Sequence, residues 1–168
     1  MSSLSVRTLS GLPEYNNAIV VQSGHKLIIP GTPTNILQAV KTDAEAISVT
    51  SGTGTPTTSN TFPITGLSLT ITPASANSRF LLIADLSYVA GFTAAWVFFR
   101  GTSPVGIGDA ANNRRRVTGA PAATTPITYS IRAMGDTSAL FYVNRSPNDS
   151  DNTTGVRPIS TLTVMELL

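Results

Sequence analysis

The pattern of apolar and polar positions predicts short β-strands along the second part of the chain. Residues alternate strictly from Leu67 to Thr72, which is typical of a strand with one buried face. From Phe80 to Val89 both alternating sets are largely apolar, as in a central strand, and Ala94–Phe99 is its expected antiparallel neighbour. Further strands are predicted at 36–41, 103–107, 116–118, 128–134, 139–145 and 160–167.

Two intervening stretches do not follow the strand pattern. Residues 42–47 are compatible with a helix, but only with one turn of it. The tract Ser51–Asn60 consists of Gly, Thr and Ser with one proline, and it predicts a solvated loop or a frayed edge. About eight strands separated by turns at near-regular spacing therefore predict an all-β fold, a jelly-roll-like β-sandwich.

The beginning of the chain differs from the rest. Its apolar pieces are too short to enclose a core, so they must pack on a neighbouring subunit or on a larger surface. The prolines and glycine of Pro30–Pro33 stop a strand ladder. We therefore expect an extended N-terminal arm over residues 1–34 and one domain over residues 35–168. The apolar pieces of the arm are Leu4–Leu9, Ala18–Val21 and Lys26–Ile29.

Composition supports a β-rich protein whose surface carries few charges. Charged residues make up 12% of the 168 residues, about half of the usual share of roughly 25%. The net charge of +2 gives no support to nucleic-acid binding. The absence of cysteine excludes disulfides, zinc–thiolate sites and cysteine nucleophiles.

The stretch Phe80–Phe99 is apolar and long enough to span a bilayer. Asp85 lies within it, and Gly91 with Thr93 interrupts it where a turn would fall. Two buried strands explain these residues better, so no membrane insertion is expected. The polar first eleven residues do not resemble a signal peptide.

Catalytic chemistry has little support in the sequence. His25 is the only histidine, it lies in the arm, and Glu14 is the only acidic residue near it. The nine acidic residues are scattered. We therefore expect no enzyme activity and assign no catalytic residue.

Three polar segments have the composition of ligand sites. Gly106–Ala111 matches a dinucleotide-binding pattern, but Arg114–Arg116 follow where a helix is needed, and those arginines are expected to be solvated or to pair across a subunit boundary. Asn148–Asn152 has oxygen ligands suited to calcium without the distal glutamate, so Asx turns are expected there. We expect no cofactor and no metal. Asn144, Asn148 and Asn152 begin formal glycosylation sequons, which mean nothing without a secretory signal.

Aromatic residues gather in the predicted strands around Trp96. Tyr88, Phe92, Trp96 and Phe98 could line a sugar-binding site. Aromatic residues in adjoining strands more often belong to the core or to a subunit interface, and this interpretation is favoured.

Several sequence segments together resemble the distal domain of tail fibres and related virion surface proteins of marine and cyanobacterial phages. The similarity covers residues 35–168, and Ser3–Leu12 and Ser23–Leu27 resemble segments that precede that domain. The segments that carry the resemblance are Asn35–Thr42, Thr65–Pro73, Arg100–Gly101, Gly108–Ala111, Tyr142–Ser146 and Ser160–Leu167.

The resemblance implies a bacteriophage structural protein with a jelly-roll-like, typically trimeric domain. The chain has no repetitive shaft or coiled coil. A compact domain with an arm suits a homotrimeric capsid decoration or cement protein, whose partners are the major capsid protein or other virion proteins and further copies of itself. Its expected location is the virion, assembled in the host cytoplasm. The alternative is a tail-fibre receptor-binding module that recognises host glycan through loops such as Ser51–Asn60 or Ala120–Pro126.

Overall fold

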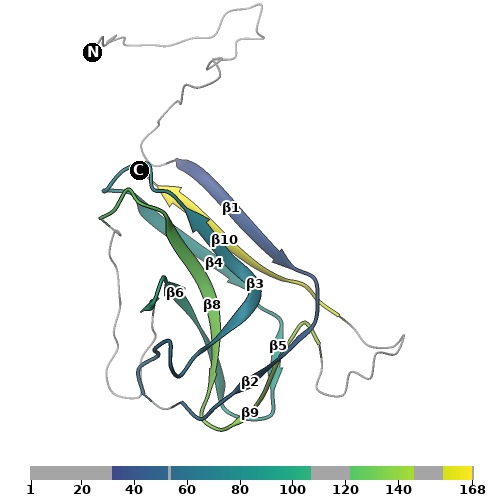
Figure 1. Ribbon diagram of the computed structural model, residues 1–168. Coiled ribbons are helices and arrows are strands. Elements are labelled where there is room, and N and C mark those ends of the chain that lie inside the picture. The colour runs from purple at the N-terminus through teal and green to yellow at the C-terminus, as the bar shows by residue number, and fades with distance from the viewer. Residues whose placement is uncertain (1–31, 53, 107–121, 146–156, 168) are drawn as a thin grey trace, which may run out of the picture.

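A computed structural model of the chain describes residues 32–52, 54–106, 122–145 and 157–167. Within these ranges the chain is all-β, with ten strands in three antiparallel sheets and no helix (Figure 1), so the predicted fold class is confirmed. The strands are β1 (Pro33–Lys41), β2 (Glu45–Val49), β3 (Phe62–Ile71), β4 (Arg79–Asp85), β5 (Tyr88–Ala90), β6 (Ala94–Arg100), β7 (Ser103–Val105), β8 (Ile127–Gly135), β9 (Ala139–Val143) and β10 (Ser160–Leu167).

Two of the sheets lie end to end. The same three stretches of the chain, here called paths, run through both of them. Sheet A has the order β1-β10-β4, and sheet B has the order β2-β9-β5. The path of β1 continues into β2, that of β4 into β5, and the central path is formed by β9 and β10. Sheets A and B are therefore two consecutive parts of a three-stranded layer.

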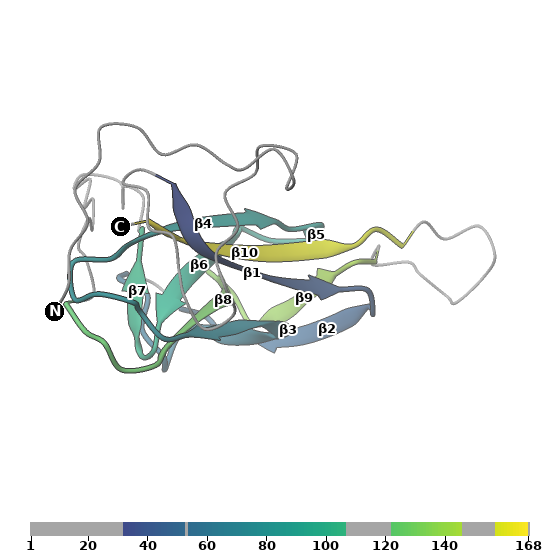
Figure 2. The same ribbon diagram turned by 90° about the horizontal axis from the view of Figure 1, so that it is seen from above.

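The third sheet supplies the other layer. Sheet C has the order β3-β8-β6-β7. Seen from above, β4 and β10 form one layer, and β3 and β8 lie in the layer opposite (Figure 2). The arrangement is sandwich-like, and the jelly-roll-like connection of its strands stays a prediction.

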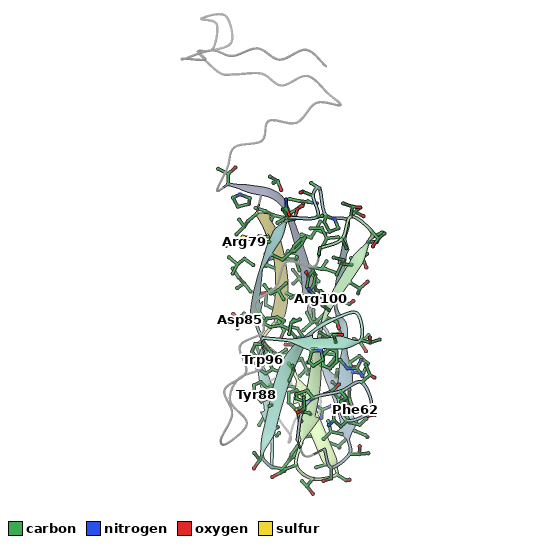
Figure 3. The ribbon with its side chains drawn as sticks, turned by 90° about the vertical axis from the view of Figure 1, so that its left-hand side faces the viewer. Phe62, Arg79, Asp85, Tyr88, Trp96 and Arg100 are labelled. Carbon is green, nitrogen blue, oxygen red and sulfur yellow. The ribbon has the colours of Figure 1, made fainter. Side chains whose placement is uncertain are left out.

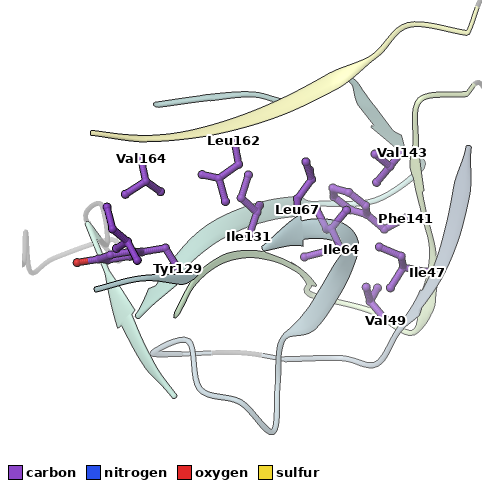
Figure 4. Packing of buried hydrophobic residues seen from close by; sticks show 12 residues of the cluster. Ile47, Val49, Ile64, Leu67, Tyr129, Ile131, Phe141, Val143, Leu162 and Val164 are labelled. Carbon is purple, nitrogen blue, oxygen red and sulfur yellow. The ribbon is translucent and has the colours of Figure 1, made fainter. Parts of the chain in front are cut away.

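The hydrophobic core lies between the layers and draws on all three sheets (Figure 4). Its residues occupy alternate positions of their strands, because successive side chains of a strand point to opposite faces. Fully burying one large aliphatic or aromatic side chain contributes about 1.5–3 kcal/mol. The cluster consists of Ile47, Val49, Ile64, Leu67, Ile71, Tyr129, Ile131, Ala133, Phe141, Val143, Leu162 and Val164.

The structure corrects two expectations about strand placement. Residues 45–49 form β2 instead of continuing a helical turn, because Ile47 and Val49 are buried and the strand pairs with β9. In the described part of the chain β4 pairs only with β10, so it is not central, and β6 pairs with β7 and β8 in the other layer.

The long apolar stretch from Phe80 to Phe99 forms β4, β5 and most of β6, as the strand interpretation predicts. In the ranges that the structure describes, no helix is long and apolar enough to cross a membrane. β1 begins at Pro33, two residues before the expected start of the domain. Proline is tolerated as the first residue of an edge strand, because that residue need not donate a backbone hydrogen bond to a neighbouring strand. Residues 1–31 of the predicted arm lie outside the described residues.

A buried polar network joins the three paths at the junction between sheets A and B. The side-chain nitrogen Nδ2 of Asn144 donates to the carbonyls of Lys41 at 2.9 Å and Asp43 at 3.1 Å. Its Oδ1 accepts a hydrogen bond from Ser160 Oγ at 2.6 Å. Ser160 Oγ accepts from the backbone N–H of Ser87 at 3.0 Å, and the N–H of Asn144 donates to Ser87 O at 2.9 Å. The side chain of Asn144 thereby contacts the β1–β2 path and Ser160 of the central path, and its backbone N–H contacts the β4–β5 path at Ser87.

The same junction is connected to sheet C through a buried lysine. Lys41 Nζ lies 2.7 Å from Asp43 Oδ2 and 3.1 Å from Glu45 Oε2. Burial opposes the charged form of Lys41, but its hydrogen bonds to Asp43 and Glu45 and the attraction of their negative charges together outweigh burial and raise the pKa of Lys41. The hydrogen bond to Lys41 lowers the pKa of Asp43. Glu45 also accepts from the N–H and hydroxyl of Thr65 in β3.

Replacing Asn144 with glycine is expected to lower the free energy of unfolding by about 2–4 kcal/mol, because each buried polar group left without a partner costs about 1–3 kcal/mol. Asn144 has a φ of 56°, which glycine adopts without strain. Urea denaturation measures the effect. Asn77→Gly, at an exposed position, is the matched control for the backbone entropy of glycine. Equal stability of the two variants would contradict the role of the Asn144 side chain.

Candidate functional site

Most of the polar candidates from the sequence lie outside the described residues. These candidates are His25, Glu14, Arg114–Arg116 and Asn148–Asn152. Of the glycine-rich segment, Gly106 alone is described, and it follows β7 with a φ of 63°, in the left-handed region that glycine favours. The described part of the chain holds no group of three or more His, Cys, Asp or Glu residues that could bind a metal.

The aromatic candidates pack mainly on the core. Trp96 and Phe98 are half-buried against it, and their rings meet edge to face with centroids 5.3 Å apart. The ring of Phe92 lies against Gly135, where any side chain would clash with it. Tyr88 stacks on Phe141 with centroids 4.9 Å apart, and Figure 3 shows Tyr88 and Trp96 among the surrounding side chains. The contacts of Phe92, Trp96 and Phe98 agree with the core interpretation, whereas Tyr88 remains 41% exposed.

Asn144, the first residue of one formal sequon, is fully buried. Its amide nitrogen is the atom that donates to the carbonyls of Lys41 and Asp43. A glycan on that nitrogen would displace both hydrogen bonds and could not be accommodated in the interior. Asn144 therefore has a structural role.

The tract expected to be a solvated loop is anchored over the outer face of sheet C. Arg132 of β8 donates from Nε to Thr61 Oγ1 at 2.8 Å and from Nη2 to the carbonyls of Thr61 and Thr58 at 2.5 and 3.3 Å. Its guanidinium lies 5.2 Å from the ring centroid of Phe99. Burial in this position lowers the pKa of Arg132. Thr57 and Thr58 remain exposed, so the loop has a fixed base and a solvated tip.

The most prominent surface feature is a set of exposed apolar side chains on the outer face of sheet A. The exposed fractions are 55% for Ile36, 49% for Val40, 45% for Leu81 and 47% for Ile83. Met165 of the central strand β10 is half-buried between them. We call these five residues the apolar strip. A contiguous exposed apolar patch on a folded protein is typical of a protein–protein contact.

The register of sheet A explains why these residues come together. Ile36, Met165 and Leu81 are directly opposite one another across β1, β10 and β4. Ile83 lies two residues further along β4, on the same face. The sequence pattern already showed both faces of residues 80–89 to be apolar, and the structure shows that the outer one is left open among the described residues.

Polar residues share this face with the apolar strip, because Gln38, Thr161 and Thr163 occupy outward positions and separate Val40 from the other four apolar residues. Gln38 Nε2 donates to Thr163 Oγ1 at 3.0 Å, which satisfies two polar groups within the face. Arg79 and Asp85 stand at the two ends of β4, and both are exposed. The alternation of β4 places them on the same face as Leu81 and Ile83. Charge is therefore confined to the ends of the strip.

Comparison of the chain with protein-family models, curated proteins and solved structures finds no match. Family membership is accordingly not shown by similarity. The sandwich, the anchored loop and the apolar strip are the features from which function is inferred.

Replacing Arg132 with methionine is expected to release the loop from sheet C. Methionine retains much of the apolar length of arginine but cannot donate to Thr61 and Thr58. Backbone amides between residues 54 and 61 should exchange hydrogen about tenfold faster, which corresponds to about 1.4 kcal/mol of lost local stability. Hydrogen–deuterium exchange read by mass spectrometry measures this, with the exposed Arg79→Met as control. Unchanged exchange in that segment would show that Arg132 does not hold the loop.

Proposed function

We propose that this chain is a non-enzymatic structural protein of a bacteriophage virion, a homotrimeric capsid decoration or cement protein on the head surface. The single observation that supports it most is the apolar strip of sheet A, because such a face suits protein–protein contact more than small-molecule chemistry. The sequence resemblance to virion surface proteins agrees with this role. The proposed partners are the major capsid protein or other virion proteins and further copies of the chain, with no nucleic acid and no membrane insertion.

The proposed shell-binding element is the N-terminal arm. Pro33 pairs with Leu167, so the arm joins the domain at the end of sheet A where β10 also ends (Figure 1). The Asn144 network and the core cluster are built from residues of the described domain. The domain can therefore keep its own structure while the arm contacts a shell and adds strands to its edges.

Removal of residues 1–31 is expected to reduce binding to phage heads that lack this protein by at least about tenfold, equivalent to about 1.4 kcal/mol. The truncation leaves β1 intact, because that strand begins at Pro33. Co-sedimentation with heads measures binding, and circular dichroism with thermal melting verifies the fold of the truncated chain. Undiminished binding by the folded truncated chain would refute the arm as the shell-binding element.

A tail-fibre module that recognises host glycan is the second candidate. It is favoured by the anchored loop, because Arg132 fixes the base of a tip at which Thr57, Thr58 and Ser59 are exposed, and the Thr57 hydroxyl is held by Ser59 Oγ at 2.8 Å and Asn60 Oδ1 at 3.0 Å. Fixed hydroxyl groups can donate and accept hydrogen bonds with a sugar without a further ordering cost. Glycan-array binding by the full chain that is lost in a Thr58→Ala variant would favour this function over the capsid role. The proposed location in either case is the virion, assembled in the host cytoplasm.

A further inference from the structure

We propose that the edge of β4 that faces away from β10 pairs with the same edge of a second copy of this chain. The two strands run antiparallel and are related by a two-fold axis at Leu82. The contact continues sheet A from one chain into the next. This inference goes beyond the proposed function, because it concerns a strand edge and holds for a chain on the head or on the tail.

β4 is an edge strand without the features that normally prevent the addition of a further strand. Within the described part of the chain it pairs only with β10. Edge strands that face solvent are usually very short, or they carry a proline, a bulge or a charge in mid-strand. β4 has seven residues, no proline and no register shift against β10, and its charges, Arg79 and Asp85, lie only at its two ends. Nothing within β4 therefore opposes pairing on its second side.

The other edge strands of the described sheets do have such protection. β1 begins at Pro33 with a register shift next to it, β3 contains Pro63 and a register shift, and β7 has three residues with Pro104 in the middle. β2 and β5 have only five and three residues. β4 is the exception, and the apolar residues on both of its faces are typical of a central strand. The pattern of β4 therefore indicates a neighbour on each side.

The charges of β4 favour a second copy of the same strand as that neighbour. When β4 pairs antiparallel with itself along all seven residues, the axis passes through its middle residue, Leu82. Each Arg79 then lies opposite the Asp85 of the other copy, at both ends of the contact. Both side chains are exposed (Figure 3), and among the described residues neither has an ion-pair partner. Opposite charges directly across two strands stabilise the pair, whereas a parallel pair would bring like charges together.

The apolar residues of β4 also complement one another in this register. On the outward face Leu81 lies opposite Ile83, so the aliphatic surfaces of the two copies join. On the inward face the large Phe80 lies opposite the small Ala84, which leaves room for the aromatic ring. One register thus satisfies charge, polarity and side-chain size together. A strand of unrelated sequence is under no such constraint, so a second copy is the occupant that β4 fits.

A two-fold contact joins chains in pairs, and it is distinct from the three-fold contact of the proposed trimer. The full chain should therefore contain two copies, or six where both contacts form. Sedimentation equilibrium at micromolar concentration should give two or six times the 17.6 kDa of one chain. A mass of one chain or of three chains would overturn the proposal.

Reversal of the charges tests the register. Arg79→Asp places two carboxylates opposite each other at both ends of the contact, and Asp85→Arg places two guanidinium groups there. Each variant should raise the dissociation constant of the two-fold contact about tenfold, measured by sedimentation over a dilution series. The double variant restores opposite charges in exchanged order and should recover the dissociation constant of the full chain.

The matched control for Asp85→Arg is Asp136→Arg, which makes the same change of charge at an exposed position between β8 and β9. It should leave the dissociation constant unchanged, and thermal melting establishes that each variant is folded. Single variants that associate like the full chain, or a double variant as weak as either single one, would refute the register.

Disulfide formation is an independent measurement, because the chain has no cysteine. Residues directly opposite in an antiparallel pair have Cα atoms about 4.5–5.5 Å apart, which a disulfide spans. Leu81→Cys co-expressed with Ile83→Cys should form covalent pairs on oxidation. In either variant alone the cysteines lie two residues out of register, beyond the reach of a disulfide.

Co-expressed variants that give no more covalent pairs than either variant alone would contradict the contact. Loss of binding to phage heads with the two-fold contact retained would refute the capsid role and leave this contact standing.

Discussion

The architecture depends on the hydrogen bonds of one buried side chain, Asn144. The central chain path leaves the sheet at Asn144 and returns at Ser160, so its backbone ladder is interrupted in the middle of a three-stranded layer. The interruption of the ladder leaves backbone carbonyls and amides that need hydrogen-bond partners inside the protein. Each such group left without a partner would destabilise the fold by about 1–3 kcal/mol. Asn144 supplies those partners to Lys41 and Asp43 and connects through Ser160 to Ser87. Sheets A and B remain aligned because this residue joins all three paths at one level.

With the layer held in register, the alternation of its strands produces both a core and a surface. Leu162 and Val164 of β10 point inward and have no exposed area, and Met165, the next residue along, belongs to the outer face. The same register places Ile36 and Leu81 on either side of Met165. The apolar strip is therefore coupled to the core by the two-residue period. A shift of one residue in β10 would exchange the two faces.

The sequence predicted elements defined by local pattern and missed those defined by distant partners. Residues 160–167 were predicted as a strand with the same bounds as β10, because their apolar positions and turn signals are local. The local pattern of residues 42–47 is compatible with a helical turn, whereas residues 45–49 form β2, because β2 pairs with β9, about a hundred positions away. Arg132 gave no signal of its contact with Thr61, which lies 71 residues away. The buried state of Asn144 could not be inferred from a motif that suggests a surface glycosylation site.

The features that indicate function are likewise only partly visible in the local sequence pattern. The apolar character of both faces of residues 80–89 is visible in the sequence, but only strand order reveals which face is covered and which is open. The direct test of the role in the virion is electron microscopy of phage particles labelled with an antibody against this chain. The account predicts label distributed over the head surface. Label confined to the tail tip, or particles without label, would contradict it.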